Sequence, residues 1–161
     1  MGRRSERPGR AADDRRERGR PARSRSMGRT ELEVLEANDA FYRAFTRHDA
    51  DAMAALWAED HPVACIHPGS DVLTGRDAVL ASWRAVLVPG GAPRLSCSHA
   101  EPHVLGDVAF VTCHEVLRDG SRLAATNVFV RERGAWRMTH HQATPIAPGQ
   151  LRPRAPIGPA N

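Results

Sequence analysis

The spacing of apolar residues changes once along this chain, and the change divides it into a helical half and a strand-forming half. Before residue 88, apolar side chains recur every three or four residues, which is typical of helices with one buried face. After residue 93 they alternate with polar residues, which is typical of half-buried strands. The pattern predicts helices at residues 30–48, 51–57 and 74–87, a short strand at 63–67, and long strands at 94–105, 108–117, 122–132 and 135–144.

Local signals indicate where these elements begin and how they connect. Thr30 and Glu33 fit a capping box, in which a hydroxyl and a carboxylate each bond a free backbone amide, so we expect the first helix to begin there. The long strands are separated by Gly106-Asp107, Asp119-Gly120 and Arg133-Gly134, and turns this short force consecutive strands to run antiparallel. We therefore expect an α+β fold in which three N-terminal helices pack in the concave face of a strongly bent antiparallel sheet.

The net charge of +4 comes from the first 27 residues and not from the predicted fold. They hold ten arginines and four acidic residues, whereas the rest of the chain holds thirteen arginines and fifteen acidic residues. Since residues 2–26 contain no apolar residue larger than Ala, we expect residues 1–29 to be a disordered leader, with Met27 as an alternative start. Clustered arginines would neutralise phosphates, but the leader has no aromatic residue to stack on bases, so nucleic-acid binding is not expected. The proline-rich residues 147–161 are expected to form a disordered tail after a domain at 30–146.

The cysteines and the hydropathy of the chain indicate in which cellular compartment the protein is expected. Cys65, Cys97 and Cys113 all fall inside predicted strands and are far apart in sequence, which favours reduced, packed thiols. The chain contains no apolar core of a secretory signal and no run long enough to span a membrane. We therefore expect a cytoplasmic protein without a membrane segment.

Several segments spread over residues 30–146 resemble one known family. These segments are 49–57 (DADAMAALW), 65–69 (CIHPG), 73–76 (LTGR), 82–83 (SW), 126–131 (TNVFVR) and 134–141, which begins GAWR and ends HH. Together with the order helix, helix, strand, helix and long meander, they are similar to nuclear transport factor two-like proteins, and most of all to the SnoaL-like branch. Relatives of that branch include ketosteroid isomerase, scytalone dehydratase and the hub domain of a calmodulin-dependent kinase.

The resemblance implies a cone-shaped α+β barrel with an apolar pocket for a small molecule. It does not imply one reaction, because this superfamily includes isomerases, dehydratases, polyketide cyclases and non-catalytic hubs. The chain also departs from the branch after its histidine pair, where it has Gln142-Ala143-Thr144-Pro145 in place of a third histidine and a Ser-Pro. No position matches the aspartate base of an isomerase, so the reaction has to be argued from the site.

Two strand registers are compatible with the turns, and they expose different faces to the interior. Two-residue turns at Asp119-Gly120 and Arg133-Gly134 would place His114 and His140 on the same face as Asn127. A single bulge would flip the partner face, because side chains alternate along a strand, and would bring Glu115 and His141 to Asn127 instead. The resemblance favours the second arrangement.

The second arrangement contains the candidates for chemistry. Glu115, among apolar neighbours, would have a raised pKa and serve as a general base; alternatively it reaches solvent at the edge or pairs with Arg122 or Arg137. His141, or His140 in the other register, would move a proton or hold a ligand oxygen, or else be a neutral core imidazole. Asn127 would donate to a developing oxyanion, or tie a strand to a helix end.

Other residues would bind the ligand rather than react with it. We expect His67 at the mouth of the cone, and Trp83, Trp57 and Tyr42 along or across the cavity, although aromatic residues at helical spacing also serve as plain core. A metal is not expected, because adjacent strand residues such as His140 and His141 point to opposite faces. No nucleotide phosphate loop is present and no cofactor is expected.

Two classes of function fit these residues. The first is a cofactor-independent enzyme that isomerises, dehydrates or cyclises a small apolar carbonyl compound. The second is a non-catalytic ligand-binding or dimerisation module. A homodimer fits both, because the predicted helices leave one face of the sheet uncovered and that face carries Val128 and Val130.

Overall fold

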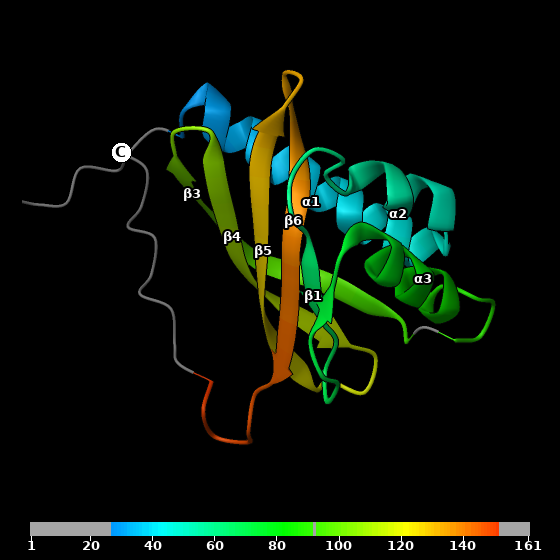
Figure 1. The fold of residues 1–161 in the computed structure, drawn as a ribbon. Coiled ribbons are helices and arrows are strands. Elements are labelled where there is room, and N and C mark those ends of the chain that lie inside the picture. Colours follow the sequence, from blue (N-terminus) through cyan, green and yellow to red (C-terminus); the bar gives the residue numbers. More distant parts are fainter. Residues whose placement is uncertain (1–26, 92, 152–161) are drawn as a thin grey trace, which may run out of the picture. The chain divides into compact units, whose positions relative to one another are not determined.

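The computed structural model describes residues 27–91 and 93–151, which form three helices and six strands (Figure 1). The predicted leader and tail lie mostly outside these residues. The helices are α1 (Arg29–Arg47), α2 (Ala50–Leu56) and α3 (Arg76–Val86), each within a few residues of its expected position. The strands are β1 (Ala64–Ile66), β2 (Leu73–Thr74), β3 (Leu95–Leu105), β4 (Val108–Leu117), β5 (Arg122–Glu132) and β6 (Ala135–Pro145).

The start of α1 differs from the predicted capping box at Thr30 and Glu33. The helix is capped at Gly28, whose backbone N–H donates to Glu31 Oε2 over 2.6 Å. Glu33 instead accepts from Arg29 and from Arg131 on β5, so its carboxylate is not available for capping. Helix α2 follows directly and is capped by Asp49, whose carboxylate accepts the N–H of Ala52.

The strands form one sheet in the order β2-β1-β6-β5-β4-β3, and the helices lie on one face of it (Figure 1). The long strands are antiparallel neighbours, as their short turns require. Strand β1 joins the edge of β6 in parallel, and β2 adds an antiparallel pair that the sequence pattern did not reveal. The expected α+β architecture, three helices against a bent sheet, is confirmed.

The register is the second of the two predicted arrangements. The turn between β4 and β5 has three residues and not two, because Leu117 N–H bonds Ser121 and Gly120 adopts a φ of 86°. Asn127 is therefore opposite Val111 and not Thr112. Between β5 and β6 the two-residue turn is present, but the register shifts between Val128 and Phe129, so that Asn127 is opposite His141.

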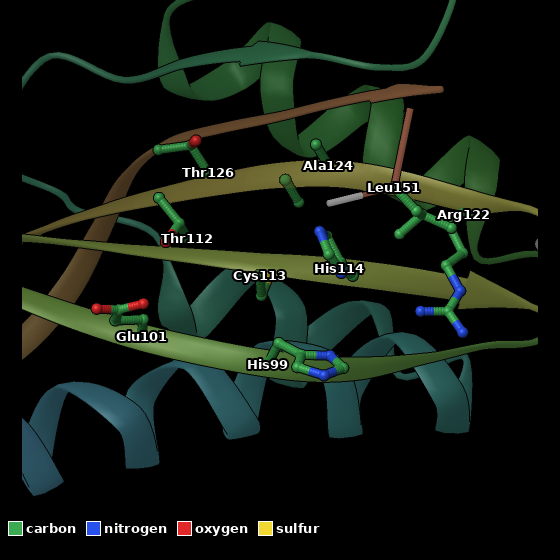
Figure 2. Close-up of a pocket in the computed structure, with 10 residues that line it drawn as sticks. His99, Glu101, Thr112, Cys113, His114, Arg122, Ala124, Thr126 and Leu151 are labelled. Atoms are coloured by element: carbon green, nitrogen blue, oxygen red, sulfur yellow. The ribbon is translucent and has the colours of Figure 1, made fainter. Parts of the chain in front are cut away.

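The face of the sheet away from the helices has its own hollow, with a volume of about 410 Å³. Figure 2 shows His99, Thr112, His114 and Thr126 around it, with Glu101 toward one end and Arg122 toward the other. Because the turn has three residues, the side chain of His114 points into this hollow and away from the side of the sheet that carries the Asn127 side chain. The hollow and the buried side chain of Asn127 therefore lie on opposite faces of the sheet.

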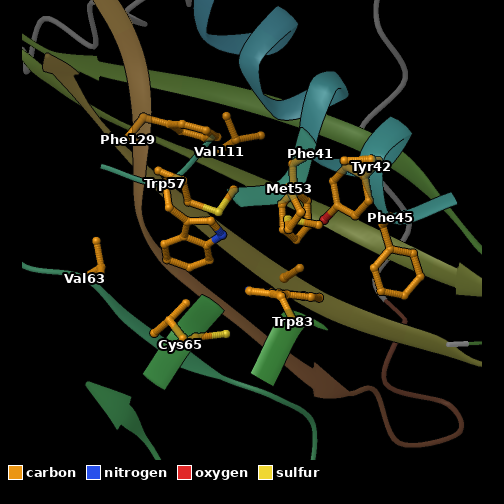
Figure 3. Packing of buried hydrophobic residues seen from close by; sticks show 14 of the residues in the cluster. Phe41, Tyr42, Phe45, Met53, Trp57, Val63, Cys65, Trp83, Val111 and Phe129 are labelled. Carbon is orange, nitrogen blue, oxygen red and sulfur yellow. The ribbon is translucent and has the colours of Figure 1, made fainter. Parts of the chain in front are cut away.

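The core lies between the helices and the sheet (Figure 3). Trp57, Phe41, Phe129 and Met53 are its largest fully buried side chains. Residues three or four apart on α1 supply one wall, and alternate residues of β4, β5 and β6 supply the other. The core is therefore continuous from the turn after α2 to the far ends of the long strands. None of the described helices is long and apolar enough to cross a membrane.

A buried carboxylate fastens the segment after α2 to the end of β5. Glu132 accepts the backbone N–H groups of Glu59 and Asp60 over 3.0 and 2.8 Å, and it contacts His61 Nδ1 at 2.9 Å. These bonds, that from Glu59 first, lower the pKa of Glu132 to about 2. The carboxylate therefore stabilises the fold above about pH 4, where it would also be ionised in the unfolded chain, and this contribution is lost as the pH falls toward 2.

We expect Glu132→Gln to lower the melting temperature by several degrees at pH 7, because an amide supplies a donor where the fold needs an acceptor. The difference from the wild type should shrink as the pH approaches 2. Thermal unfolding followed by circular dichroism at a series of pH values measures this. Glu36→Gln, at an exposed position on α1, is the matched control; an equal effect of both substitutions would contradict the anchoring role.

Candidate functional site

Asn127 is the centre of a buried hydrogen-bond network between β5 and α1. Its amide nitrogen donates to Asn38 Oδ1 over 2.8 Å and to Tyr42 Oη over 3.3 Å. Its amide oxygen lies 2.6 Å from His141 Nδ1, which therefore carries the proton and donates. Asn38 and Asn127 are both completely buried. The amide thus ties the sheet to the first helix and also orients His141.

Glu115 lies beside this network and shares Tyr42 with it. The Tyr42 hydroxyl donates to Glu115 Oε1 over 3.0 Å and lies 3.1 Å from Cys113 Sγ. Glu115 is 4% exposed. Burial raises the pKa of its carboxyl above the ordinary value, and the bond from Tyr42 offsets only part of that rise. The alternatives of an edge position and of an arginine partner are wrong, since no described arginine pairs with Glu115.

His141 faces the same carboxyl. Its Nε2 atom is 3.9 Å from Glu115 Oε1, and its side chain is 3% exposed. Burial lowers the pKa of His141 to about 3, with His67 and His140 adding to the effect. The imidazole is therefore neutral at physiological pH. With Nδ1 donating to Asn127, the lone pair of the neutral ring is on Nε2, the nitrogen nearer to Glu115.

Aromatic rings cover the network on the side of α3. Trp83 packs edge-on against Phe41 at 5.3 Å between ring centroids and lies 5.6 Å from the ring of His141. His67, from the end of β1, contacts Trp83 at 4.7 Å and bonds Ser82 Oγ through Nε2 over 3.0 Å. The indole N–H of Trp83 is buried without a hydrogen-bond partner among the described residues.

The structure brings most of the predicted site residues together, but not all of them. Glu115, His141, Asn127, Tyr42 and Trp83 form one continuous cluster, with His67 at its rim. His140 is not part of it, because it is adjacent to His141 on a strand and so faces the opposite side of the sheet. Trp57 is fully buried and lies against β6 at Met138, further along the core.

Sequence reasoning missed two members of the network. Asn38 supplies the acceptor for Asn127, and Cys113 contacts Tyr42. A signal for Asn38 was present: it follows Val34 by four residues and precedes Tyr42 by four, so a polar side chain occupies the apolar stripe of α1. Nothing comparable marks Cys113, since a cysteine in a strand resembles an ordinary apolar residue.

A surface groove of about 440 Å³ leads to the network between α1 and the start of β3. Tyr42 and Cys97 lie at its inner wall, and Asp39, Arg43 and Arg47 line its rim. Tyr42 lines the groove and also bonds Glu115. Its side chain is therefore what separates the groove from the carboxyl. With two arginines and one aspartate, the rim has a net positive charge.

The described residues contain no group of three or more His, Cys, Asp or Glu that could hold a metal ion. The polar set is instead one carboxyl, one neutral imidazole, one phenol and two amides, which are the groups of proton transfer and hydrogen bonding. An interior of this kind can bind a carbonyl or hydroxyl group and move a proton near it.

The SnoaL-like domain family matches residues 34–148, which is most of the chain and includes every residue of the network. The chain belongs to the SnoaL-like family. The resemblance seen in the sequence is thereby confirmed, and so is its implied fold.

Two solved structures are similar to this SnoaL-like domain in both sequence and fold. A presumed dehydratase of the NTF2-like family from Streptomyces avermitilis is 33% identical, with a TM-score of 0.67, over 73% of this chain and 96% of that one. A presumed calcium/calmodulin-dependent protein kinase type II association domain from Thiobacillus denitrificans is 39% identical, with a TM-score of 0.64, over 70% of this chain and 94% of that one. One relative is thus described as an enzyme and the other as an assembly domain.

A curated relative is the F-box protein SKIP8 of Arabidopsis thaliana, which is 29% identical over 112 residues. The match covers 69% of this chain and 48% of that protein, so the chain spans about half the length of this relative.

Proposed function

We propose that this SnoaL-like domain binds a small carbonyl or β-hydroxy carbonyl compound beside Glu115 and transfers a proton on it, as an isomerase or dehydratase does. The observation that carries the proposal is the Glu115 carboxyl. It is buried without an arginine partner among the described residues, bonded by Tyr42 and close to the neutral His141.

Stability alone does not account for this carboxyl. A buried ionisable group without a compensating charge destabilises a fold, and an apolar side chain of similar volume would serve a plain core better. Buried titratable groups with perturbed pKa values are characteristic of sites where protons move. The surroundings of Glu115 therefore support a chemical role more than a structural one.

We infer a role for each residue from this arrangement. Glu115, with its raised pKa, would take a proton from the carbon next to the carbonyl and return it to another atom of the substrate. Tyr42 would orient the carboxyl, and the Nε2 lone pair of His141 would accept a hydrogen bond from a substrate hydroxyl. Asn127 would hold His141 rather than touch the substrate, since its amide is fully engaged with Asn38, Tyr42 and His141. Trp83 would cover the ligand and donate its free N–H to it.

The test uses β-hydroxy ketones and β,γ-unsaturated ketones, because dehydration of the first and isomerisation of the second both give a conjugated enone that absorbs in the ultraviolet. We expect Glu115→Gln to lower kcat at least about 100-fold for any compound that the wild type converts. Glu36→Gln, exposed on α1, should leave kcat unchanged. Full turnover by Glu115→Gln would refute the proposal. So would a panel in which nothing is converted and nothing shifts the NMR signal of the Glu115 carboxyl.

A second candidate is a non-catalytic assembly module, and two observations favour it. The polar groups of the network bond one another, with Phe41 and Trp83 packed over them, as an interior without a ligand requires. The face of the sheet without helices presents half-exposed Val128 and Val130, which suits a second copy of the chain. The 39% identical association domain is consistent with this interpretation.

Substitution of Val128 tests the assembly directly. We expect light scattering after size exclusion to give the mass of a dimer for the wild type and of a monomer for Val128→Glu, because a carboxylate cannot be buried unpaired between two sheets. Val72→Glu places the same charge at an exposed position just before the edge strand β2, which β1 and β6 separate from β5, and this variant should remain dimeric. A monomeric wild type would rule out this homodimer.

A further inference from the structure

The hollow on the face of the sheet without helices is lined by polar side chains from neighbouring strands (Figure 2). Glu101 on β3 is opposite Thr112 on β4, which is opposite Thr126 on β5, so these side chains form one row across the sheet. His114 lies two residues along β4 from Thr112 and therefore points to the same face. Arg122 lies at the other end of the hollow. Its volume of about 410 Å³ is within the range of small-molecule sites.

Arg122 is a half-buried cation whose side chain makes no hydrogen bond or ion pair with any described residue. The next arginines along the chain, Arg131 and Arg133, both pair with acidic side chains. Figure 2 shows the Arg122 side chain extending from β5 over β4, on the side of the hollow where His99 and His114 lie. A guanidinium is always charged, and its N–H groups match the geometry of a carboxylate. This end of the hollow therefore suits a carboxylate.

His99 adds a further polar group to the hollow. It lies in the register shift between Ser98 and Glu101 and has a φ of 55°, and its ring centroid is 5.5 Å from that of His114. Its Nδ1 atom is 3.2 Å from Ser98 Oγ, and its Nε2 atom bonds none of the described residues. With the Ser98 hydroxyl donating to Nδ1, the Nε2–H group is a donor for an anion or a hydroxyl in the hollow.

The threonine pair indicates what the rest of a ligand would carry. Thr112 and Thr126 are half-buried, and a threonine hydroxyl both donates and accepts, as the hydroxyl groups of a ligand do. Arg122 and Thr126 are four residues apart on β5, which is about 13 Å along a strand. An arginine side chain covers only part of that distance, so a ligand that contacts both residues must be several bonds long. The Glu101 carboxylate beyond the threonines disfavours a second negative charge at that end.

We propose that this hollow binds a small monocarboxylate with several hydroxyl groups, such as a sugar acid, with its carboxylate on Arg122 and its hydroxyl groups on Thr112 and Thr126. The site is separate from the one proposed around Glu115, because the two lie on opposite faces of the sheet, and its ligand need not be a substrate. It is also separate from Val128, the proposed contact with a second copy, which does not line the hollow.

Isothermal titration calorimetry of the full chain with D-glucuronate tests the proposal, with two probes that each lack one half of the ligand. Glucose has the hydroxyl groups without the carboxylate, and hexanoate has the carboxylate without the hydroxyl groups. We expect glucuronate to bind at least about tenfold more tightly than either, because both halves of the site contribute. In NMR spectra glucuronate should shift the imidazole signals of His99 and His114, but not that of His141, which is buried on the other face.

Substitutions assign the two halves of the ligand to their residues. Arg122→Gln should weaken glucuronate binding at least about tenfold, and Thr126→Val at least about threefold. Arg84→Gln, at an exposed position on α3, should bind as the wild type does. The proposal would be overturned by no binding of glucuronate, by unchanged affinity in Arg122→Gln, by phosphate binding as tightly as glucuronate, or by a shift of His141 alone. The comparison of probes on the wild type decides even where a variant fails to fold.

Discussion

Replacing Asn127 with leucine should lower the free energy of unfolding by about 2–5 kcal/mol, because at least two partners lose their hydrogen bonds inside the core. Asn38 Oδ1 would lose its donor, and His141 Nδ1 would lose its acceptor. Each buried polar atom left unpaired costs about 1–3 kcal/mol. Urea unfolding of the wild type and of Asn127→Leu measures the difference. Thr126→Val, the neighbouring position on the other face of β5, should change stability by no more than about 0.5 kcal/mol.

A double-mutant cycle separates the network from simple packing. If Asn38 and Asn127 stabilise the fold through their mutual bond, Asn38→Leu with Asn127→Leu should cost less than the sum of the single changes, by about 1 kcal/mol or more. The second substitution removes an acceptor that the first has already left unpaired. Strict additivity would show that the two amides act independently.

Acidification should destabilise the protein below about pH 6.5 through His141. The unfolded chain binds a proton at this residue near pH 6.5, whereas the folded chain does so only near its pKa of about 3. The stabilising difference is therefore complete above pH 6.5 and is lost as the pH falls, by up to about 1.4 kcal/mol per pH unit. Between about pH 6.5 and pH 4.5 we expect a loss of about 2–3 kcal/mol.

Glu115 acts in the opposite direction. Its pKa is raised in the folded state, so its contribution is complete below the unfolded value of about 4.3 and is lost as the pH rises through the folded value. It therefore offsets part of the acid loss. Urea unfolding from pH 8 to 4.5 measures the sum of both effects.

The variant His141→Gln isolates the histidine. At pH 8 it should be less stable than the wild type because the bond to Asn127 is altered, but its stability should fall less steeply toward pH 4.5. The two curves should therefore converge as the pH is lowered. Parallel curves over the whole range would show that His141 is not the source of the acid sensitivity.

The limits of the helices and long strands followed from the sequence because their signals are local. Alternation along residues 108–117 and 122–132 requires only neighbouring residues, and both strands have the bounds expected from it. Strand β2 escaped notice because two residues, Leu73 and Thr74, are too few to show a period. The cap of α1 moved from Thr30 to Gly28 because Glu33 pairs with Arg131, about a hundred residues further along the chain.

The candidate site was predictable as a set of residue types but not as a geometry. Glu115, Asn127 and His141 were recognisable as polar residues in apolar strands. Whether they met depended on one residue in the turn before Ser121 and one register shift after Val128, and either change reverses the face of every following side chain. A resemblance to SnoaL-like proteins favoured the correct arrangement where the turn signals alone favoured the other.

By itself, then, the sequence determined the succession of helices and long strands, the α+β class and the family, because these depend on periodicity and on short motifs. Only the tertiary structure decided that Asn38 meets Asn127 and Cys97, and that Tyr42 joins Glu115 to Cys113. Such contacts join α1, β3, β4 and β5 across long stretches of chain. They arise from how the helices pack on the sheet, which no local pattern encodes.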